Sequence, residues 1–389
     1  MKHPATILLA LMKLDIGGAE THAVVLARHL TEMGYKVIMA SNGGCFEAEI
    51  ARYGVKHYRV PLHQPKISLI WRAARAMRRI VREEKVGLIH AHARIPAFVT
   101  AVMGRPKSVR FITTAHFNFE YRYGLKYLSR WGEKTIAVSE DIKDHLIKHF
   151  QVPAENIVVI PNGIDTDVFR PLPGTGQEEE EQEKREEQAG RKGNGGKETR
   201  ITLVSRLDGD QLAGVALNLI AACEQLYGAR PELRLAIVGD GTRRTEVEKC
   251  ASEFNERAGK EVAALLGART DVNKIMAKSD LVVGVSRVAL EAMACAKPVL
   301  LAGPQGFGGL LDPQKLAFFQ KDNFTARSAG EKTTAENLAA SLQDFLNRPG
   351  SWRTAAGRVF RNFIEKEYSS RQMAQRVARV YQEVFNQRQ

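Results

Sequence analysis

Two glycines at the start of a predicted helix are the first residues whose type and spacing could do chemistry. The segment Asp15-Ile-Gly17-Gly18-Ala-Glu20-Thr21 follows a short apolar run and precedes a helical pattern. Glycine lets the backbone come close to a ligand, and the N–H groups of a helix start carry partial positive charge that suits phosphate. A plain tight turn would use the same glycines, so both interpretations stay open for this loop.

Three segments in the second half of the chain place glycines or cations directly after predicted strands. Arg206 lies in the first of them, VSRLDGDQ, and Gly239 and Gly241 lie in the second. The third, Gly-Val-Ser-Arg287, opens the predicted helix that carries Glu291. Loops at the carboxyl ends of parallel strands meet at one sheet edge, so we expect these segments to converge. Two arginines able to face an anion there predict a pocket for a nucleotide diphosphate.

The elements that must position these loops alternate between short strands and longer helices. Apolar runs rich in branched residues predict the strands, and apolar residues spaced three or four apart predict the helices. This alternation is typical of a mostly parallel, doubly wound α/β sheet, and it starts afresh near residue 201. Late in the chain, Thr333 and Glu336 have the spacing of a capping box at a helix start. The predicted strands are 7–12, 36–40, 86–91, 109–114, 135–138 and 157–160, and then 201–204, 233–238, 262–266, 281–283 and 298–301.

The length of 389 residues suggests two or three domains. We place an N-terminal domain at 1–173, a charged flexible linker or insertion at 174–200, a second domain at 201–366 and a C-terminal helix at 367–389. The linker cannot bury a core, because Ala189 is its only apolar residue. The C-terminal helix is expected to pack back on the N-terminal domain through an apolar stripe. That stripe consists of Met373, Val377, Val380 and Val384.

Composition and charge exclude several classes of protein. Fractions of 44% hydrophobic, 26% charged and 7% aromatic residues are ordinary for a globular chain and exclude extensive disorder. The 57 Lys and Arg against 44 Asp and Glu give a net charge of +13, which favours an anionic partner. Nucleic acid would explain the charge and none of the glycine loops, so we expect no nucleic-acid partner.

The cysteines and the apolar runs favour a cytoplasmic protein. The first apolar run, 5–12, has no small-residue cleavage site after it and is interpreted as a buried strand instead of a signal peptide. No run approaches the ~20 apolar residues that a membrane-spanning helix needs. Four widely spaced cysteines lack the spacing of a metal or redox motif and are interpreted as thiols in a reducing compartment: Cys45, Cys223, Cys250 and Cys295.

The order of motifs resembles the family 4 retaining glycosyltransferases. The motifs are GGAE, HAH, TTAH, AVSE, IPNGIDTDVF, VSRLDGD, VGDG and VALEAMACAKPV, and they span almost all of the chain apart from the linker. The resemblance implies the GT-B fold, in which two Rossmann-like domains face each other across a cleft. It implies metal-independent transfer of a hexosyl or N-acetylhexosaminyl unit with retention of configuration. The donor would be a nucleotide sugar, with a UDP-sugar favoured, and the acceptor an envelope glycan or a lipid-linked intermediate, with no further cofactor.

The resemblance also assigns roles to individual residues. Glu291 matches the glutamate that holds the donor ribose, Arg206 the arginine that pairs with the diphosphate, and His116 the histidine near the transferred sugar. These three are the catalytic candidates. Gly17 and Gly18 match the glycine loop that faces the reaction centre. The other donor-binding candidates are Gln211, Gly239, Gly241, Ser286, Arg287, Val288 and Ala289, the last four through backbone N–H groups at a helix start.

Two positions depart from the family pattern. Gln211 stands where a diphosphate-binding lysine is expected, and Val283 stands where the first of two paired glutamates is expected. Loss of one preorganised charge contact at a transition state costs ~3 kcal/mol, or about a hundredfold in rate. Arg287 is expected to replace the lysine, because a guanidinium binds phosphate well. The departures leave two alternatives open: a nucleotide-sugar-binding protein without turnover, and a sugar-nucleotide epimerase on the same fold.

Three histidines have two interpretations each. His90 and His92 share a strand face and could bind a metal ion, but no third ligand lies near them in the sequence, so no metal is expected. His116 is either a site residue or a hydrogen-bonded structural histidine.

One predicted helix has a basic outer stripe. A solvated face is the simpler interpretation, and attraction to anionic lipid at the inner face of a membrane is the alternative. The helix carries Trp71, Arg72, Arg75, Arg78, Arg79, Arg82 and Lys85.

Overall fold

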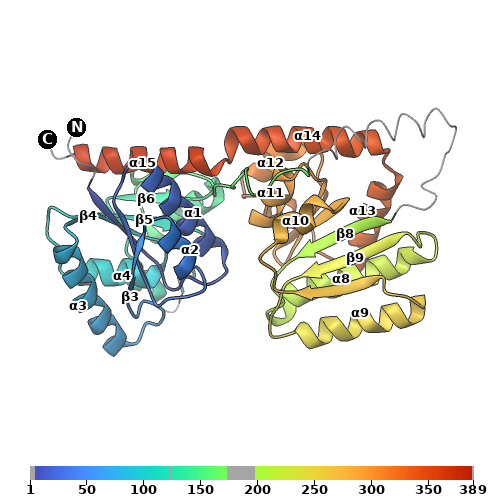
Figure 1. Ribbon diagram of the computed structural model, residues 1–389, viewed down its shortest axis with the longest axis horizontal. Helices are drawn as coiled ribbons and strands as arrows, with labels where there is room; N and C mark the ends of the chain where they lie inside the picture. Colours follow the sequence, from blue (N-terminus) through green and yellow to red (C-terminus); the bar gives the residue numbers. More distant parts are fainter. Residues whose placement is uncertain (1–4, 123, 173–197, 388–389) are drawn as a thin grey trace. The chain divides into compact units, whose positions relative to one another are not determined.

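The computed structural model describes residues 5–122, 124–172 and 198–387 and divides the chain into two compact units (Figure 1). Unit 1 comprises residues 1–163 and 368–389, and unit 2 comprises residues 164–367. The first boundary therefore falls ten residues earlier than the expected end at 173. Most of the expected linker lies outside the described residues, and its last two positions, Thr199 and Arg200, begin the first strand of unit 2.

Unit 1 is built on a sheet of seven parallel strands in the order β3-β2-β1-β4-β5-β6-β7. The order reverses between β1 and β4, where Ala10 lies beside Ala91. Ligands of such sheets bind outside the carboxyl ends of the strands at this switch point. The strands are β1 (Thr6–Ala10), β2 (Val37–Ser41), β3 (Lys56–Arg59), β4 (Val86–Ala91), β5 (Arg110–Ala115), β6 (Lys134–Ala137) and β7 (Ile157–Val159).

Helices cover both faces of the unit 1 sheet. Ile7 and Leu9 of β1 pack into one core with α1 and α15, whereas Leu8 and Ala10 pack into another with α3 and α4. Successive side chains of a strand point to opposite faces, so a strand buried on both faces has a continuous apolar run. The helices are α1 (Gly18–Glu32), α2 (Glu47–Arg52), α3 (Ile67–Glu83), α4 (Arg94–Val102), α5 (Leu125–Leu128), α6 (Glu140–Phe150) and α15 (Ser370–Asn386).

The C-terminal helix α15 is part of unit 1 and packs against α1 (Figure 1). The four residues of its predicted apolar stripe are all buried. Tyr381 is fully buried, its ring packs edge-on against Tyr35, and its hydroxyl lies 2.8 Å from Nδ1 of His90 in β4. Helix α15 thereby completes the core of the first unit.

Unit 2 repeats the architecture with a six-stranded sheet in the order β10-β9-β8-β11-β12-β13. Its strands are parallel except for the antiparallel pair β12 and β13, and the order reverses between β8 and β11. The strands are β8 (Thr199–Val204), β9 (Leu233–Val238), β10 (Ala263–Gly267), β11 (Leu281–Gly284), β12 (Val299–Gly303) and β13 (Gly306–Leu310). The helices are α8 (Gly209–Tyr227), α9 (Arg244–Ala258), α10 (Val272–Ala277), α11 (Arg287–Ala294), α12 (Leu316–Gln320), α13 (Ala335–Asn347) and α14 (Gly350–Glu367).

The α/β prediction is confirmed. The structure has two strands that were not predicted, and one helix is capped one residue later than predicted. Strands β3 and β13 lie at sheet edges, and their sequences, KHYR and GFGGL, have no branched apolar run from which to predict them. Helix α13 is capped by Thr334, whose hydroxyl accepts a hydrogen bond from the backbone N–H of Asn337. The predicted cap, Thr333, instead donates its hydroxyl to the carbonyl of Gly303 at 2.8 Å.

Candidate functional site

Three loops of unit 2 lie at one sheet edge, because β9, β8 and β11 are neighbours in the sheet. Arg206 follows β8, Gly239 and Gly241 follow β9, and the pair Val285-Ser286 connects β11 to α11. This edge includes the switch point between β8 and β11, where ligands of doubly wound sheets bind. The topology therefore brings together the segments that the sequence predicts to converge.

The glycines after β9 allow two of these loops to pack against each other. Gly239 has φ +152, and a Cβ atom there would lie 1.8 Å from the carbonyl oxygen of Ser205. A Cβ atom on Gly241 would lie 2.4 Å from the carbonyl carbon of Leu207. Both positions need glycine for packing within unit 2, which is a different reason from ligand approach. Donor binding by Gly239 and Gly241 stays a prediction.

Arg206 extends into solvent from the β8–α8 loop. Its side chain is 76% exposed, and its nearest carboxylate oxygen, on Asp208, is 3.9 Å away. A long ion pair in an exposed position is weak, so it leaves the guanidinium donors accessible to an anion. Gln211, in the first turn of α8, is also exposed.

Arg287 and Glu291 form a buried ion pair along one turn of α11. Nε of Arg287 lies 2.7 Å from Oε1 of Glu291, and their side chains are only 15% and 11% exposed. Burial raises the pKa of the Glu291 carboxyl, and the positive charge of Arg287 opposes this rise. Because a carboxylate has two oxygens, Glu291 can hold Arg287 through one and accept a hydroxyl through the other.

The backbone at the start of α11 is strained, and some of its N–H groups are hydrogen-bonded within the protein. Ser286 has φ +53, and conformations of this kind cost of order 1–3 kcal/mol outside glycine and gather at functional sites. Its N–H donates to the carbonyl of Phe324 at 2.8 Å, and the N–H of Val288 donates to the carbonyl of Val285 at 3.2 Å. Two of the four backbone amides predicted to bind phosphate are therefore used within the protein, which departs from that prediction.

The structure explains why the first glutamate of the family pattern is absent. Val283 lies inside β11, fully buried in the core and beside Leu203 of β8. Only two residues connect β11 to α11, so the position eight residues before Glu291 falls within the strand. A carboxylate there would enter an apolar core, where an unpaired charge is strongly disfavoured.

The glycine loop of unit 1 begins α1 at the switch point between β1 and β4. Gly17 is the N-cap residue and has an extended backbone, and a Cβ atom there would lie 2.3 Å from Oε2 of Glu20. A Cβ atom on Gly18 would have nothing within 4 Å. The helix start therefore has open space at Gly18, and the role of both glycines at a reaction centre stays a prediction.

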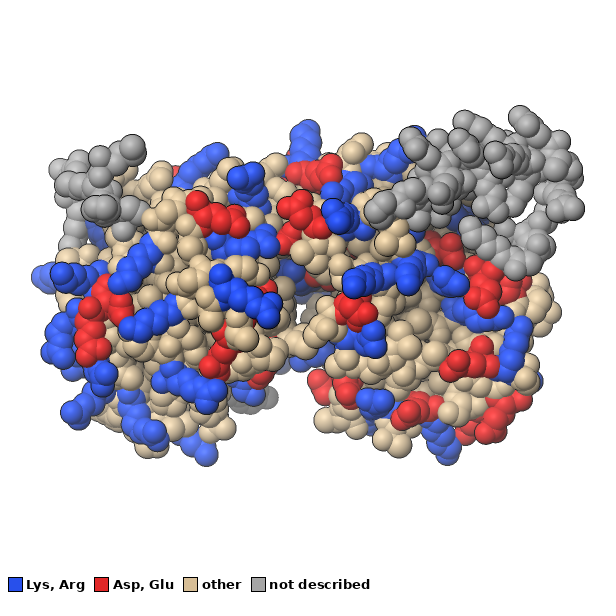
Figure 2. Space-filling view, in the orientation of Figure 1, with Lys and Arg blue, Asp and Glu red and all other residues tan. Residues whose placement is uncertain are grey.

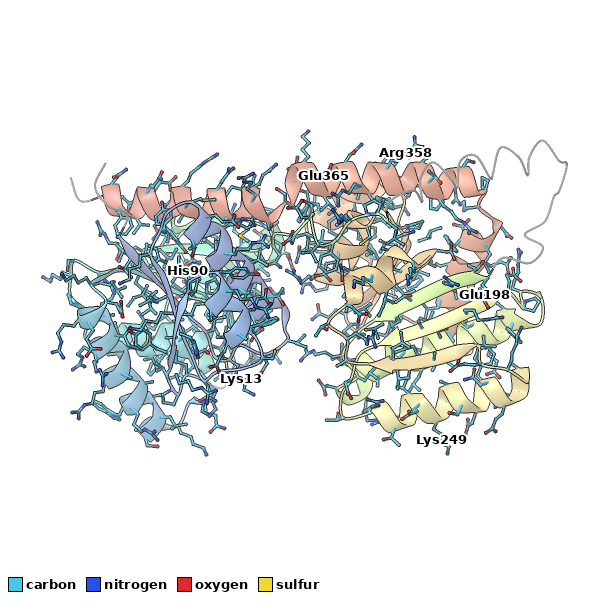
Figure 3. The ribbon with its side chains drawn as sticks, in the orientation of Figure 1. Lys13, His90, Glu198, Lys249, Arg358 and Glu365 are labelled. Carbon is cyan, nitrogen blue, oxygen red and sulfur yellow. The ribbon has the colours of Figure 1, made fainter. Side chains whose placement is uncertain are left out.

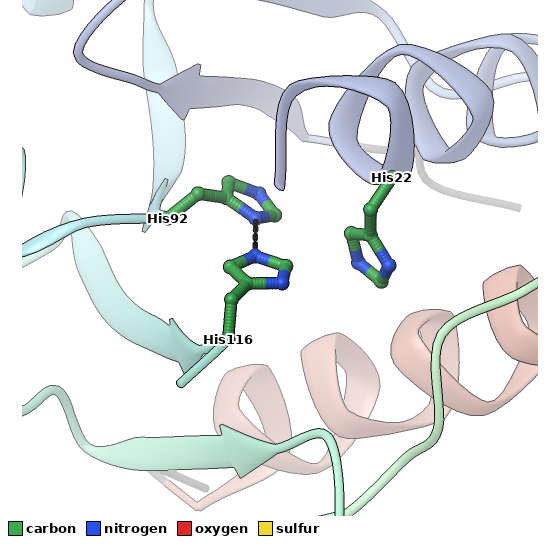
Figure 4. Close-up of side chains that lie close together, drawn as sticks. All are labelled: His22, His92 and His116. Atoms are coloured by element: carbon green, nitrogen blue, oxygen red, sulfur yellow. Dashed lines mark hydrogen bonds between the residues drawn. The ribbon is translucent and has the colours of Figure 1, made fainter. Parts of the chain in front are cut away.

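Three histidines gather at the same edge of unit 1 (Figure 4). His92 directly follows β4, His116 directly follows β5, and His22 lies in α1. Nδ1 of His92 is 3.2 Å from Nε2 of His116, and the ring of His22 packs edge-on against that of His116 with 4.8 Å between centroids. The predicted neighbourhood of His90 and His92 is confirmed, with 4.1 Å between their ring centroids, and the topology adds His22 and His116 to it.

His90 lies in the interior of unit 1 (Figure 3) and its two ring nitrogens are both used. Nδ1 bonds to the hydroxyl of Tyr381, and Nε2 bonds to the hydroxyl of Thr114 at 2.6 Å. Burial, together with neighbouring histidines, lowers the pKa of His90 and of His92 well below its usual value. Both imidazoles are therefore neutral at physiological pH.

Two protein-family profiles match the chain. Residues 16–168 match the profile of Glycosyltransferase Family 4, and residues 198–344 match that of Glycosyl transferases group 1. Among curated relatives, the phosphatidylinositol N-acetylglucosaminyltransferase gpi3 subunit of Schizosaccharomyces pombe is 21% identical and aligns with 95% of this chain and 78% of its own length. The UDP-Gal:alpha-D-GlcNAc-diphosphoundecaprenol alpha-1,3-galactosyltransferase of Escherichia coli is 26% identical over 65% of this chain and 67% of its own length.

Solved structures are similar over nearly the whole chain. A glycosyltransferase from Rickettsia africae superposes with a TM-score of 0.73 at 20% identity and covers 98% of this chain and 99% of its own. Alr3699/HepE from Anabaena, in complex with UDP and glucose, superposes with a TM-score of 0.71 at 17% identity and covers 97% of this chain and 99% of its own.

Proposed function

Because this chain belongs to the family 4 type of glycosyltransferases and has the two-domain, Rossmann-like GT-B fold, we propose that it transfers a sugar from a UDP-sugar to a glycan or lipid-linked acceptor with retention of configuration. The observation that carries the donor assignment is that exposed Arg206 and the Arg287–Glu291 pair follow the neighbouring strands β8 and β11, whose carboxyl ends lie at the unit 2 switch point. The Anabaena neighbour with bound UDP and glucose supports a UDP-sugar. The two relatives named for phosphatidylinositol and diphosphoundecaprenol substrates support a lipid-linked acceptor.

The proposed chemistry depends on stabilising the departing diphosphate. The acceptor hydroxyl forms a bond to the anomeric carbon on the face from which UDP leaves, while the bond from that carbon to the β-phosphate oxygen breaks. The leaving phosphate oxygen takes the proton of the acceptor hydroxyl, so the products are UDP and the glycoside. Arg206 and Arg287 supply the positive charge that the leaving group needs, which is commonly the largest contribution in such a step. Glu291 binds the ribose through the oxygen that does not hold Arg287, and the family resemblance alone assigns His116 a role near the transferred sugar.

Donor binding tests this proposal without knowledge of the acceptor. Calorimetric titration with UDP, UDP-glucose, UDP-N-acetylglucosamine and GDP-mannose should show binding of the uridine compounds. Replacement Arg206→Ala should weaken UDP binding about tenfold or more, because a charge-assisted contact to phosphate is lost. The matched control is Arg257→Ala, an exposed arginine at the end of α9 paired with Glu224, which should leave UDP affinity unchanged. An equal loss of UDP affinity in the two variants, or no UDP binding by the wild type, would contradict the assignment of a UDP-sugar donor.

A second candidate function is nucleotide-sugar binding without turnover. It is favoured by the apolar core position of Val283 and by Gln211 at the position of the usual lysine. Incubation of the bound donor with candidate acceptors distinguishes a transferase from a binding protein. Both are stabilised thermally by the donor, but a binding protein releases no UDP. Proton NMR of the donor without acceptor identifies the third alternative, since an epimerase would change the sugar signals. Gln211→Lys should increase UDP release if the lost cation limits transfer.

The basic helix α3 offers a route to a membrane-bound acceptor, which we include in the proposal. None of the helices in the described ranges is both apolar enough and long enough for a transmembrane span. Figure 2 shows Lys and Arg side chains gathered around α3, at the lower left of the view. Trp71 and Ile67, on the same helix, are 71% and 75% exposed. Exposed aromatic and aliphatic side chains flanked by arginines suit the interface of an anionic bilayer.

Vesicle sedimentation tests the membrane proposal. Vesicles with phosphatidylglycerol should bind the protein more strongly than vesicles of phosphatidylcholine alone, and the difference should shrink with salt. The double variant Arg72→Gln/Arg75→Gln should remove about 2 kcal/mol of this binding, on the basis of about 1 kcal/mol per basic residue at the surface. The control is Arg52→Gln/Lys148→Gln, which removes two exposed cations elsewhere on unit 1. Equal binding to both vesicle types would remove the electrostatic explanation.

A further inference from the structure

We propose that His22, His92 and His116 of unit 1 bind one divalent transition-metal ion, with zinc as the ion that their chemistry suits best. Each ring offers one nitrogen, and the three nitrogens lie within 4.8 Å of one another (Figure 4). Three imidazoles with an open fourth position form a zinc site that takes water or another oxygen ligand. The site lies in unit 1, so the inference does not rest on the proposed donor pocket of unit 2.

The fold brings the three rings together from separate elements. His22 comes from α1, His92 from the end of β4 and His116 from the end of β5, all at the carboxyl edge next to the switch point. His22 and His92 are each 1% exposed, and His116 is half-buried. Ligands in a helix or directly after a strand of a packed sheet are held more precisely than ligands on long loops.

His92 has a ring nitrogen that the described part of the protein does not satisfy. Its Nδ1 lies in hydrogen-bond contact with Nε2 of His116, while its Nε2 is buried and has no hydrogen-bond partner among the described residues. A buried polar atom without a partner costs free energy, and coordination to a metal ion would recover it. His90 is excluded as a ligand because Tyr381 and Thr114 use both of its nitrogens.

The ligand set also limits the identity of the ion. The group contains only imidazoles, which suit zinc, copper, nickel and cobalt, whereas magnesium and calcium prefer oxygen ligands. Nitrogen ligands about 2.0 Å from a tetrahedral zinc ion are about 3.4 Å apart. A nitrogen pair at the 4.8 Å limit would therefore have to close by about 1.4 Å on binding.

Metal titration tests the proposal with a readout that is independent of sugar transfer. The full chain, stripped with a chelator and dialysed, should bind one equivalent of Zn²⁺ by calorimetry. Co²⁺ in its place should give the strong visible absorption of a four-coordinate site, and Zn²⁺ should displace it. His22→Ala and His92→Gln should each weaken Zn²⁺ binding about tenfold or more. Circular dichroism in the presence of chelator checks that each variant is folded, and His22→Gln serves as the alternative if one is not.

A matched control uses a second close histidine pair of unit 1, outside the cluster. His145 and His149 lie one turn apart on α6, with ring centroids 4.8 Å apart. The double variant His145→Ala/His149→Ala should keep full Zn²⁺ and Co²⁺ binding. Loss of binding in this control, or binding by His22→Ala equal to that of the wild type, would overturn the proposal, as would a wild type that binds neither ion. His22→Ala should keep its affinity for UDP, so a failure of the metal site and a failure of the donor pocket are distinguishable.

Discussion

The carboxyl edges of the two sheets have the same topology and opposite chemistry. In unit 1 the strand order reverses between β1 and β4, and in unit 2 it reverses between β8 and β11. The edge of unit 1 holds a cluster of imidazoles in which His92 and His22 are buried, and burial lowers the pKa of His92 well below its usual value. The edge of unit 2 holds exposed Arg206 and the charged Arg287–Glu291 pair.

Under the proposed function and the proposed metal site, one architecture would serve two kinds of ligand. The parallel strands fix where the loops emerge, while the side chains of the first few loop residues decide what can bind there. A diphosphate needs cations and accessible donors, which the edge of unit 2 provides. Clustered imidazoles suit a metal ion or a neutral hydroxyl compound, and an acceptor hydroxyl is the chemistry that the proposed function expects on this side.

The largest expected effect is on stability, when a glycine at each of the two sheet edges is replaced by alanine. Gly239→Ala should destabilise unit 2 by about 4 kcal/mol, because the new Cβ atom adds backbone strain at φ +152 and overlaps the carbonyl oxygen of Ser205. Gly18→Ala should change the stability of unit 1 by less than about 0.5 kcal/mol, because nothing lies near its Cβ position. Urea unfolding followed by the fluorescence of Trp352 in unit 2 and Trp131 in unit 1 measures both. A tolerated alanine at Gly239 would contradict the packing explanation.

The second prediction sharpens the role of charge at the unit 2 edge. Arg287→Ala should lower kcat/KM about 100-fold, since a cation facing the leaving diphosphate is lost, and Arg287→Lys should recover part of this. The control is Arg348→Ala on α13, which removes a helical ion pair of the same spacing with Asp344. Steady-state release of UDP is the measurement. An Arg287→Ala enzyme with unchanged turnover and UDP affinity would refute the idea that Arg287 replaces the missing lysine.

The third prediction tests how α15 supports the unit 1 edge. Tyr381→Phe removes the hydroxyl partner of His90 in a fully buried site and should cost about 1–2 kcal/mol. Tyr127→Phe, at a tyrosine that is 75% exposed, should cost nothing measurable. Chemical unfolding in a Trp352→Phe background reports unit 1 alone, because Trp71 and Trp131 both belong to it. Equal stabilities for the two variants would show that the Tyr381–His90 bond contributes nothing.

The smallest expected effect is a pH dependence of opposite sign in the two units. Lys36, Lys56 and Tyr58 hold the pKa of Glu84 at about 2, so its contribution to the stability of unit 1 is present above pH 4.5 and is lost as the pH falls toward 2. Burial raises the pKa of Glu291, so its contribution to unit 2 is present below pH 4.5 and is lost as the pH rises through the folded-state pKa.

Two glutamine variants measure this contrast. Glu84→Gln should destabilise unit 1 by about 1 kcal/mol at pH 7, because the lysines are largely exposed, and should have no effect near pH 2. The free energy of unfolding of Glu291→Gln, relative to that of the wild type, should be lower at pH 4 than at pH 7. Unfolding curves across this pH range provide the test, and parallel pH profiles for the two variants would contradict the assignment of opposite shifts.

The sequence predicts most of the scaffold and the location of the proposed donor edge. Both follow from the spacing of apolar residues and from the alternation of strands and helices along the chain. Apolar strand runs and the stripe of α15 are local signals, and the convergence of the loops after β8, β9 and β11 follows from parallel strands. The edge strands β3 and β13 escape prediction because β3 is partly exposed and polar, and β13 is rich in glycine, so neither has a branched apolar run. The spacing of Arg287 and Glu291 shows that they can pair, but only the packing of α11 shows that the pair is buried.

The grouping of His22 with His92 and His116 also needs the fold. These residues are separated by 70 and 24 positions in the sequence, and they meet because α1, β4 and β5 adjoin the same switch point. A signal for His22 exists in retrospect, since it lies four residues before Leu26 and shares the buried face of α1. That signal identifies a buried histidine without naming its partners.

Hydrogen–deuterium exchange of the full chain with and without UDP tests the central claim most directly, because it reports where the nucleotide binds without any substitution. The account predicts UDP-dependent protection in the segments 204–211, 238–243 and 284–291 of unit 2. Protection confined to unit 1, or none in these three segments at a UDP concentration that saturates binding, would contradict it.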